Sequence, residues 1–305
     1  MGVGTAPARV AGGLAITVVF RLLALLGAYL VGLPVQSAAQ PPDPTGLEYK
    51  FRLSPELSDK AQRNRLWELV TGVAVDEWPA GVKVKSKKCR LVQYLDTEHN
   101  SVQRHDFILR HRMKLDDDDC SAGEIPENSK GSLALKYRSE EARKSSEQAK
   151  EPWAREGEGK LEMDLLYSKT GDVLGMRRAF SVSAKHEDTQ LPKDVAQARS
   201  LYPGALPFLA PDARLRVGCR RIFERVWELE PGNLKLPDEI ELAVWYRRIS
   251  RGSEALLAEL SFKADANDPE AAIEADALAN RLLRTLGPRW LADAGAKTET
   301  AYECE

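Results

Sequence analysis

Apolar and charged residues alternate along several segments of this chain. Between residues 47 and 53, every odd position is apolar and every even position is charged. A period of two predicts a β-strand with one apolar and one charged face. The same alternation recurs at 105–115 and 132–138. Further strands are predicted at 82–96, 160–167, 175–184, 214–230, 239–249 and 255–264.

Helices are expected at fewer places. Ser54 and Pro55 begin a predicted helix that reaches about Val70, with Leu57, Ala61, Leu66 and Leu69 as its buried stripe. The clearest helix follows Asp268, which caps it ahead of Pro269, and it is expected to end at Gly287 and Pro288. Its predicted buried residues are Ile273, Ala277, Leu282 and Leu286.

The remaining segments are expected to be short or irregular. A short helix is predicted at 191–200 and a proline-rich bend at 203–211. The polar stretch 139–159 is predicted to be a flexible crossing or a short surface helix. These elements together predict an α+β fold that is mainly antiparallel β.

The first 39 residues have the composition of a bacterial export signal. They contain no Asp or Glu, and two apolar runs, 14–20 and 22–33, are separated only by Arg21. We expect cleavage before Gln40, a proline-rich leader at 40–46, and a periplasmic or secreted protein without a stable membrane span. An uncleaved membrane anchor is the alternative, because 14–33 is long enough to span a bilayer. Arg21 argues against it.

Cleavage leaves 266 residues, which suit one large or two small domains. Losing Arg9 and Arg21 lowers the net charge from −2 to −4. A nucleic-acid partner is therefore not expected, because such proteins usually carry a strong basic excess. Any basic site must be local.

Four cysteines are an even number for a compartment in which disulfides persist. No Cys-x-x-Cys pair is present, which argues against zinc. Three pairings are possible. We favour Cys89 with Cys120 and Cys219 with Cys304.

The chain has no Gly-x-Ser-x-Gly elbow, no phosphate-binding glycine loop that opens a helix, and no His-Glu-x-x-His helix. The acidic tract 116–119 lacks the ligand spacing of a calcium loop and is predicted to be a solvated loop. His111 alternates with apolar residues and is interpreted as a structural histidine.

Charges of one sign recur on single strand faces. Solvent exposure explains any one such face. In a closed sheet, however, these charges would line a lumen, where they are costly unless they hold a ligand. Arginine and lysine match phosphate oxygens, and carboxylates hold a hard divalent ion. The pattern thus favours a polyphosphorylated anion with Mg²⁺ or Mn²⁺. The faces are Lys50 with Arg52; Arg110, Arg112 and Lys114; Lys136 with Arg138; Glu162 with Asp164; and Glu239 with Glu241.

Several of these motifs resemble the CYTH superfamily, the triphosphate tunnel metalloenzymes. The segment 46–50, Gly-Leu-Glu-Tyr-Lys, is similar to that family's Glu-x-Glu-x-Lys signature. The motifs Gln-Tyr-Leu-Asp-Thr at 93–97, Leu-Arg-His-Arg at 109–112 and Leu-Ala-Leu-Lys at 133–136 follow in the family's order. The late strands 239–246 and 258–262 and the closing helix resemble its C-terminal hairpin and helix.

The resemblance implies an eight-stranded antiparallel tunnel with a few flanking helices over residues 47–290, followed by a tail at 291–305. Such tunnels bind triphosphates or longer phosphate chains with a divalent metal ion, and some hydrolyse them. The resemblance implies metal ligands at Glu48, Glu259 and, as a possible third, Glu162. Residues that would contact the anion are Lys50, Arg52, Arg110, Arg112, Lys136, Arg138 and Arg220 or Arg221.

Two positions depart from the family pattern. Gly46 replaces the first signature glutamate, and Ser261 replaces a glutamate of the C-terminal pair. Fewer anionic ligands hold a metal ion more weakly. The hypotheses are therefore a metal-dependent tripolyphosphatase, a tunnel protein that binds anions without catalysis, and an envelope protein whose partner is another protein.

Overall fold

The computed structural model describes nine stretches of the chain: residues 43–75, 83–115, 130–156, 159–170, 173–218, 221–230, 240–247, 255–293 and 297–302. The predicted signal segment, the acidic tract 116–119, Arg220 and three of the cysteines lie outside them. The disulfide pairing therefore stays a prediction. Among the described helices, none is both long and apolar enough to cross a lipid bilayer.

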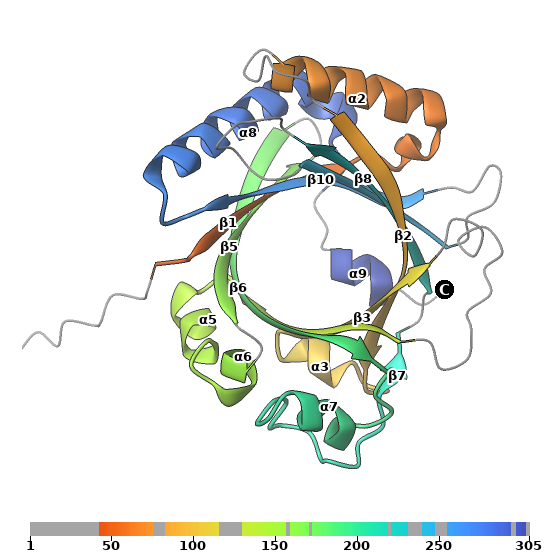
Figure 1. Cartoon of the computed structure of the whole chain (residues 1–305), viewed down its shortest axis with the longest axis vertical. Helices are drawn as coiled ribbons and strands as arrows, with labels where there is room; N and C mark the ends of the chain where they lie inside the picture. The colour runs from red at the N-terminus through yellow and green to blue at the C-terminus, as the bar shows by residue number, and fades with distance from the viewer. Residues whose placement is uncertain are drawn as a thin grey trace, which may run out of the picture. The chain divides into compact units, whose positions relative to one another are not determined.

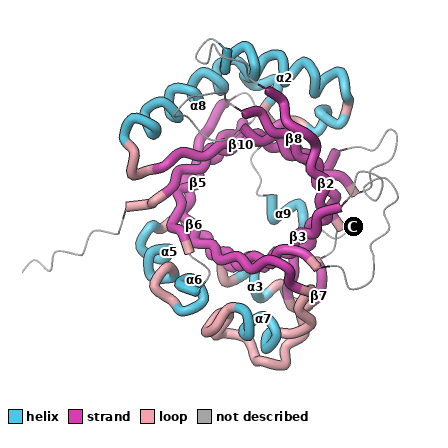
Figure 2. Tube along the Cα trace, in the orientation of Figure 1, coloured by secondary structure: helices cyan, strands magenta, loops and turns pink. Residues whose placement is uncertain are grey.

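Nine of the described strands form a closed barrel (Figures 1 and 2). Their order is β3-β4-β6-β5-β1-β10-β9-β8-β2, and β2 pairs with β3 to close the ring. A tenth strand, β7 (Arg216–Val217), pairs with β2 outside the ring. The barrel strands are β1 (Gly46–Leu53), β2 (Lys83–Asp96), β3 (Phe107–Leu115), β4 (Gly131–Ser139), β5 (Lys160–Thr170), β6 (Val173–Thr189), β8 (Ile222–Glu230), β9 (Ile240–Tyr246) and β10 (Ala255–Asp265).

The predicted α+β barrel is confirmed, but the expected count of eight strands is wrong. The expected all-antiparallel arrangement is also interrupted at β5, which pairs antiparallel with β6 on one side and parallel with β1 on the other. All other neighbours in the ring are antiparallel. The segment 214–230, expected to be one strand, forms the separate strands β7 and β8.

Alternation along the strands separates an apolar outer face from a polar inner one. In β1, Tyr49, Phe51 and Leu53 are fully buried in an apolar cluster outside the ring. Helices α2 (Lys60–Val75) and α8 (Pro269–Trp290) cover this cluster (Figure 1). Burial of such side chains contributes about 1.5–3 kcal/mol each and fixes which face of β1 turns inward.

A second apolar cluster lies outside β3, β4 and β6. Its anchors include Trp153 in α6 (Pro152–Glu156) and Tyr202 just after α7 (Val195–Leu201), both of which are buried. The Tyr202 hydroxyl donates to the carbonyl of Leu133 at 2.6 Å. The stretch 139–159, predicted to be a flexible crossing or a surface helix, thus forms α5 (Ala142–Gln148) and α6, and α6 contributes to the core.

The other helices are η1 (Pro55–Ser58), α3 (Ser101–Arg104) and α9 (Lys297–Tyr302). The closing helix α8 begins after Asp268 as predicted, but it continues through a kink at Gly287, where φ is +60°, to Trp290. Ile273 is 69% exposed, so its assignment to the buried stripe is wrong. The stripe runs instead through Ala271, Ala275, Leu278, Ala279, Leu282 and Leu286.

The described residues beyond 290 pack against the barrel. Leu291 bridges to Leu53 at the end of β1, and Asp293 bridges to Lys169 in β5. Helix α9 lies inside the ring of strands (Figure 2). There Ala301 and Tyr302 are buried in a third apolar cluster, with Tyr94 and Trp245.

Candidate functional site: a charged tunnel

The barrel encloses a cavity of about 700 Å³. Its volume falls within the range of about 300–1,000 Å³ that small-molecule sites occupy. Every barrel strand and α9 contribute lining residues. Of the residues predicted from the sequence, the lining includes Glu48, Lys50, Arg110, Arg112, Lys136, Arg138, Glu162 and Glu259.

Two predicted anion ligands lie elsewhere. Arg221 is exposed and does not line the cavity. Arg52 is buried, but a terminal nitrogen of its guanidinium donates to Thr300 Oγ1 of α9 at 3.2 Å. Arg52 therefore contacts the C-terminal helix and does not line the cavity. No pattern in the sequence predicted α9 at this place.

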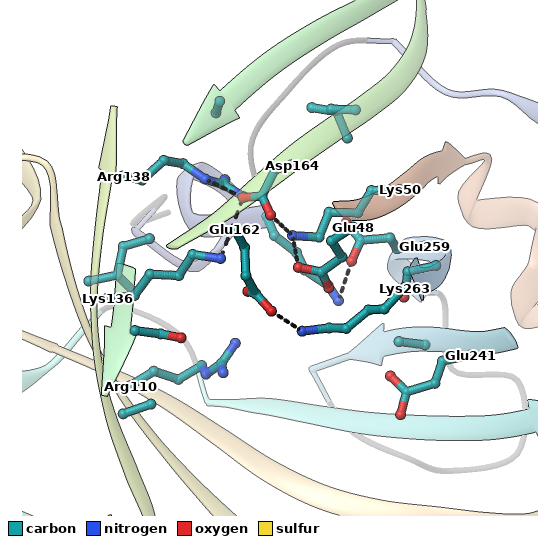
Figure 3. A pocket seen from close by; sticks show the side chains of 18 of the residues that line it. Glu48, Lys50, Arg110, Lys136, Arg138, Glu162, Asp164, Glu241, Glu259 and Lys263 are labelled. Carbon is teal, nitrogen blue, oxygen red and sulfur yellow. Dashed lines mark hydrogen bonds and ion pairs between the residues drawn. The ribbon is translucent and has the colours of Figure 1, made fainter. Parts of the chain in front are cut away.

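Three carboxylates converge on one wall of the tunnel. Glu48 on β1 and Glu162 and Asp164 on β5 can place one oxygen each within 4.8 Å of the others. The parallel register, which pairs Gly46 with Glu162 and Glu48 with Asp164, brings them together. Lys50 bridges two of them, at 2.7 Å from Glu48 and 3.0 Å from Asp164 (Figure 3).

Asp164 is the centre of this ion network. Besides Lys50, it accepts from Arg138 Nε at 3.0 Å and Lys136 Nζ at 3.4 Å. Its side chain is only 2% exposed. Burial alone would raise its pKa, but Lys136, Lys50 and Arg138 outweigh burial and hold the pKa well below its usual range.

The same balance acts on the neighbours of Asp164. Burial opposes ionisation of Glu48, yet Lys50 and Lys136 lower its pKa to about 2. For Lys136 burial is the stronger effect, and it lowers the pKa to about 8 despite the attraction of Asp164. Lys136 therefore loses its charge at a lower pH than Lys50 and Lys263, whose pKa values nearby carboxylates raise.

A different wall is rich in arginine. Arg112 and Arg90 both approach Glu224 on β8, at 3.6 and 3.4 Å. Glu224 is almost fully buried and also accepts from Trp245 Nε1 at 2.9 Å. Burial would raise the pKa of Glu224, but Arg112, Lys297 and Arg90 hold it well below its usual range.

Arg110 lies beside this group without a carboxylate partner. The described residues form no ion pair with it, and its Nε has no hydrogen-bond partner. Burial and the neighbouring Arg112 lower its pKa, while contact with Tyr94 partly offsets them. A partly buried guanidinium in this position is suited to an anionic ligand.

Several lining residues were missed by sequence reasoning. Asp164 belongs to a charged alternation that the sequence shows, but Glu162 alone was selected as a ligand. Lys263 alternates with Glu259 and Ser261 in the same way, and it pairs with Glu162 at 2.6 Å. Glu224 and Arg90 lie in strands that carry other charges but no regular alternation. Lys297 comes from α9, for which the sequence carried no signal.

A hard divalent ion fits the carboxylates Glu48, Glu162 and Asp164, because their oxygens converge and carboxylate oxygen is its preferred donor. Glu259, expected to be a metal ligand, is outside this group and pairs with Lys297 at 2.9 Å. Gly46 faces Glu162, and a Cβ added there would lie 3.5 Å from Glu162 Cγ. The glutamate absent from position 46 would therefore have joined the same group.

Comparisons with other proteins were made by sequence and by structure. No protein-family model matches the chain, and no curated protein matches its sequence. Solved structures do show likeness. A Hippeastrum protein named for adenylyl cyclase, in which a dominant triphosphatase activity was found, matches with a TM-score of 0.41 and 12% identity over 83% of this chain and 92% of its own.

Two bacterial proteins provisionally named adenylate cyclases are also similar. The one from Bacillus halodurans has a TM-score of 0.39 and 14% identity, over 85% of this chain and 100% of its own. The one from Vibrio parahaemolyticus has a TM-score of 0.35 and 11% identity, over 85% of this chain and 98% of its own.

Proposed function

We propose that the tunnel binds a short polyphosphorylated anion such as tripolyphosphate, together with one divalent metal ion. The observation that carries this proposal is the charge of the enclosed cavity. Among the residues that the structure describes, the lining contains ten lysines and arginines against eight aspartates and glutamates. Such an excess in a partly desolvated space is costly unless an anion offsets it.

Basic lining residues would bind the anion, and a group of carboxylates would bind the metal ion. Arg110 and Arg112 offer guanidinium forks that match phosphate oxygens, and Lys136 adds a point charge from the neighbouring strand β4. Glu48, Glu162 and Asp164 would hold the metal ion. When bound, Mg²⁺ or Mn²⁺ would bridge ligand oxygens and polarise a phosphorus centre.

Hydrolysis of the terminal phosphate is the stronger form of the proposal. The lining cations would offset the negative charge that develops on the departing phosphate. Activation of water is less well supported by these residues. A general base works best with a pKa near the working pH, whereas Glu48 and Asp164 are held strongly ionised.

Binding without turnover is therefore the second candidate. It is favoured by the low carboxylate pKa values and by the replacement of two expected carboxylates with Gly46 and Ser261. A tunnel of this kind would capture or carry its anion.

Calorimetric titration of tripolyphosphate into the purified protein, with and without Mn²⁺, tests both candidates. Saturable heat with phosphate release would support hydrolysis, and saturable heat without release would support binding alone. Sulfate at the same concentration is the control for simple charge attraction. Absence of heat under all conditions would contradict the proposed anion site.

A further inference from the structure

The ammonium of Lys297 lies inside the tunnel between two carboxylates. Its Nζ is 2.9 Å from Glu259 Oε1 on β10 and 3.7 Å from Glu224 Oε1 on β8. It also lies over the ring of Trp245, 5.0 Å from the centroid. Trp245 in turn donates to the same Glu224 oxygen at 2.9 Å. The ammonium therefore contacts three side chains, those of Glu259, Glu224 and Trp245.

Strand β9 separates the two strands that carry these carboxylates. It lies between β8 and β10, with Ala243 directly opposite Glu259 and Trp245 directly opposite Glu224. The Lys297 ammonium is within ion-pair distance of both carboxylates, so Glu259 and Glu224 face a common point.

Helix α9 holds Lys297 at that point. At the other end of the helix, Ala301 and Tyr302 are buried against Tyr94 and its apolar neighbours. Arg52 on β1 donates to Thr300. Burial at one end of so short a helix restricts where Lys297 at its start can lie.

Lys297 is also the single described ion-pair partner of Glu259, which the sequence resemblance marked as a metal ligand. Two buried carboxylates facing one point would ordinarily attract a cation. Here the chain supplies that cation itself. Lys50 bridges Glu48 and Asp164 in a similar way, but there Glu162 adds a third carboxylate, which Glu259 and Glu224 lack among the described residues.

The structure assigns Lys297 as a resident cation that occupies the place of a second metal ion between Glu259 and Glu224. This inference rests on the proposed function, in which a divalent ion binds at Glu48, Glu162 and Asp164. The consequence is a tunnel limited to one metal ion, with Glu259 and Glu224 neutralised by the tail. Lys297→Met then exposes a latent metal site.

Counting bound Mn²⁺ by electron paramagnetic resonance on the full chain, without any phosphate, tests the assignment. Compared with the wild type, Lys297→Met is expected to bind one additional Mn²⁺ per chain. The double variant with Glu259→Gln is expected to lose that ion again. Lys297→Arg keeps the positive charge and serves as the matched control, with the wild-type count.

A second measurement does not depend on the folding of the Lys297 variants. Glu259→Gln in the wild-type background is expected to leave the Mn²⁺ count unchanged, because Lys297 and not a metal ion occupies the site. A reduced count would overturn the assignment. So would a folded Lys297→Met protein, verified by its near-ultraviolet circular dichroism, that binds no additional Mn²⁺.

The outcomes separate this inference from the proposed function. If the wild type binds no Mn²⁺ but Lys297→Met binds one through Glu259, the resident cation is supported while the metal part of the proposed function fails. Tripolyphosphate titration is a separate experiment, and its failure leaves the Mn²⁺ difference between the two proteins unaffected.

Discussion

At the scale of single residues, Arg110 is a partly buried tunnel cation that lines the cavity without an ion-pair partner among the described residues. Most other lining cations already neutralise a carboxylate, as Lys50, Lys263 and Arg138 do. A guanidinium of this kind should contribute more to anion binding than to folding.

Arg110→Ala is accordingly expected to weaken tripolyphosphate binding by about 1.5–3 kcal/mol, roughly 10- to 150-fold. The free energy of unfolding should stay the same or rise, because repulsion from Arg112 is removed. Calorimetry and urea unfolding measure the two effects. Arg143→Ala on the exposed surface of α5 removes the same charge outside the tunnel and should leave affinity unchanged. Equal affinity in both variants would argue against the anion site.

Lys136 gives the tunnel a pH dependence. Its pKa is lowered to about 8 by burial, so the free protein loses this charge as the pH rises through 8. Because a bound anion favours the protonated lysine, tripolyphosphate affinity should be full below pH 8 and decrease above it, by up to about tenfold per pH unit.

Lys136→Arg isolates this effect, because arginine stays charged over the whole range. Titrations of both proteins at pH 7, 8 and 9 should show a difference that grows with pH. A constant difference would mean that Lys136 is not the titrating group, and any decrease shared by both proteins belongs to the anion or to other residues.

At the scale of elements, α9 is a short helix whose position depends on Tyr302. The ring of Tyr302 is buried and lies 5.9 Å from that of Tyr94. Tyr302→Ala is expected to lower the free energy of unfolding by about 3 kcal/mol, through lost burial and a cavity. Ile273→Ala on the exposed face of α8 is the matched truncation and should change it by less than about 0.5 kcal/mol. Urea unfolding of both variants decides whether α9 is an integral part of the barrel.

Sequence patterns predicted the strands better than the connections. The regular alternation of β1, β3 and β4 fixes both the strand and its inward face, since a shift by one residue would bury charge. Residues such as Lys50, Arg110 and Lys136 were therefore found from the sequence. Alternation does not reveal which strands become neighbours, so the parallel β1–β5 pair and the role of Asp164 were missed.

The tail illustrates a second limit. Six residues of α9 are too few for a periodic signal, and their stability comes from contacts with residues distant in sequence. Lys297 could not be linked with Glu259 without the fold. The expected boundary between the tunnel domain and its tail, near residue 290, thus separates two parts of one site.

At the scale of the whole molecule, we propose that the protein is exported and processed, on the basis of the composition of residues 1–39. Expressed with its complete N-terminus in a bacterial host, it should be recovered from the periplasm or medium with Gln40 as its first residue. Intact-mass measurement of each cell fraction checks this. Ala39→Arg, which places a large charge at the cleavage position, should retain the leader, and identical masses for both proteins would contradict cleavage there.

The pairing of β1 with β10 also dictates when the molecule can fold. Glu48 is opposite Lys263, and the ring cannot close until a strand some 200 residues later is available. Until then β1 and β9 each present an unpaired edge, which invites aggregation. Contacts of such long range make folding slow. A newly made chain must therefore remain open almost to its end, and in that state it is threaded through a membrane more easily than a barrel that has already closed.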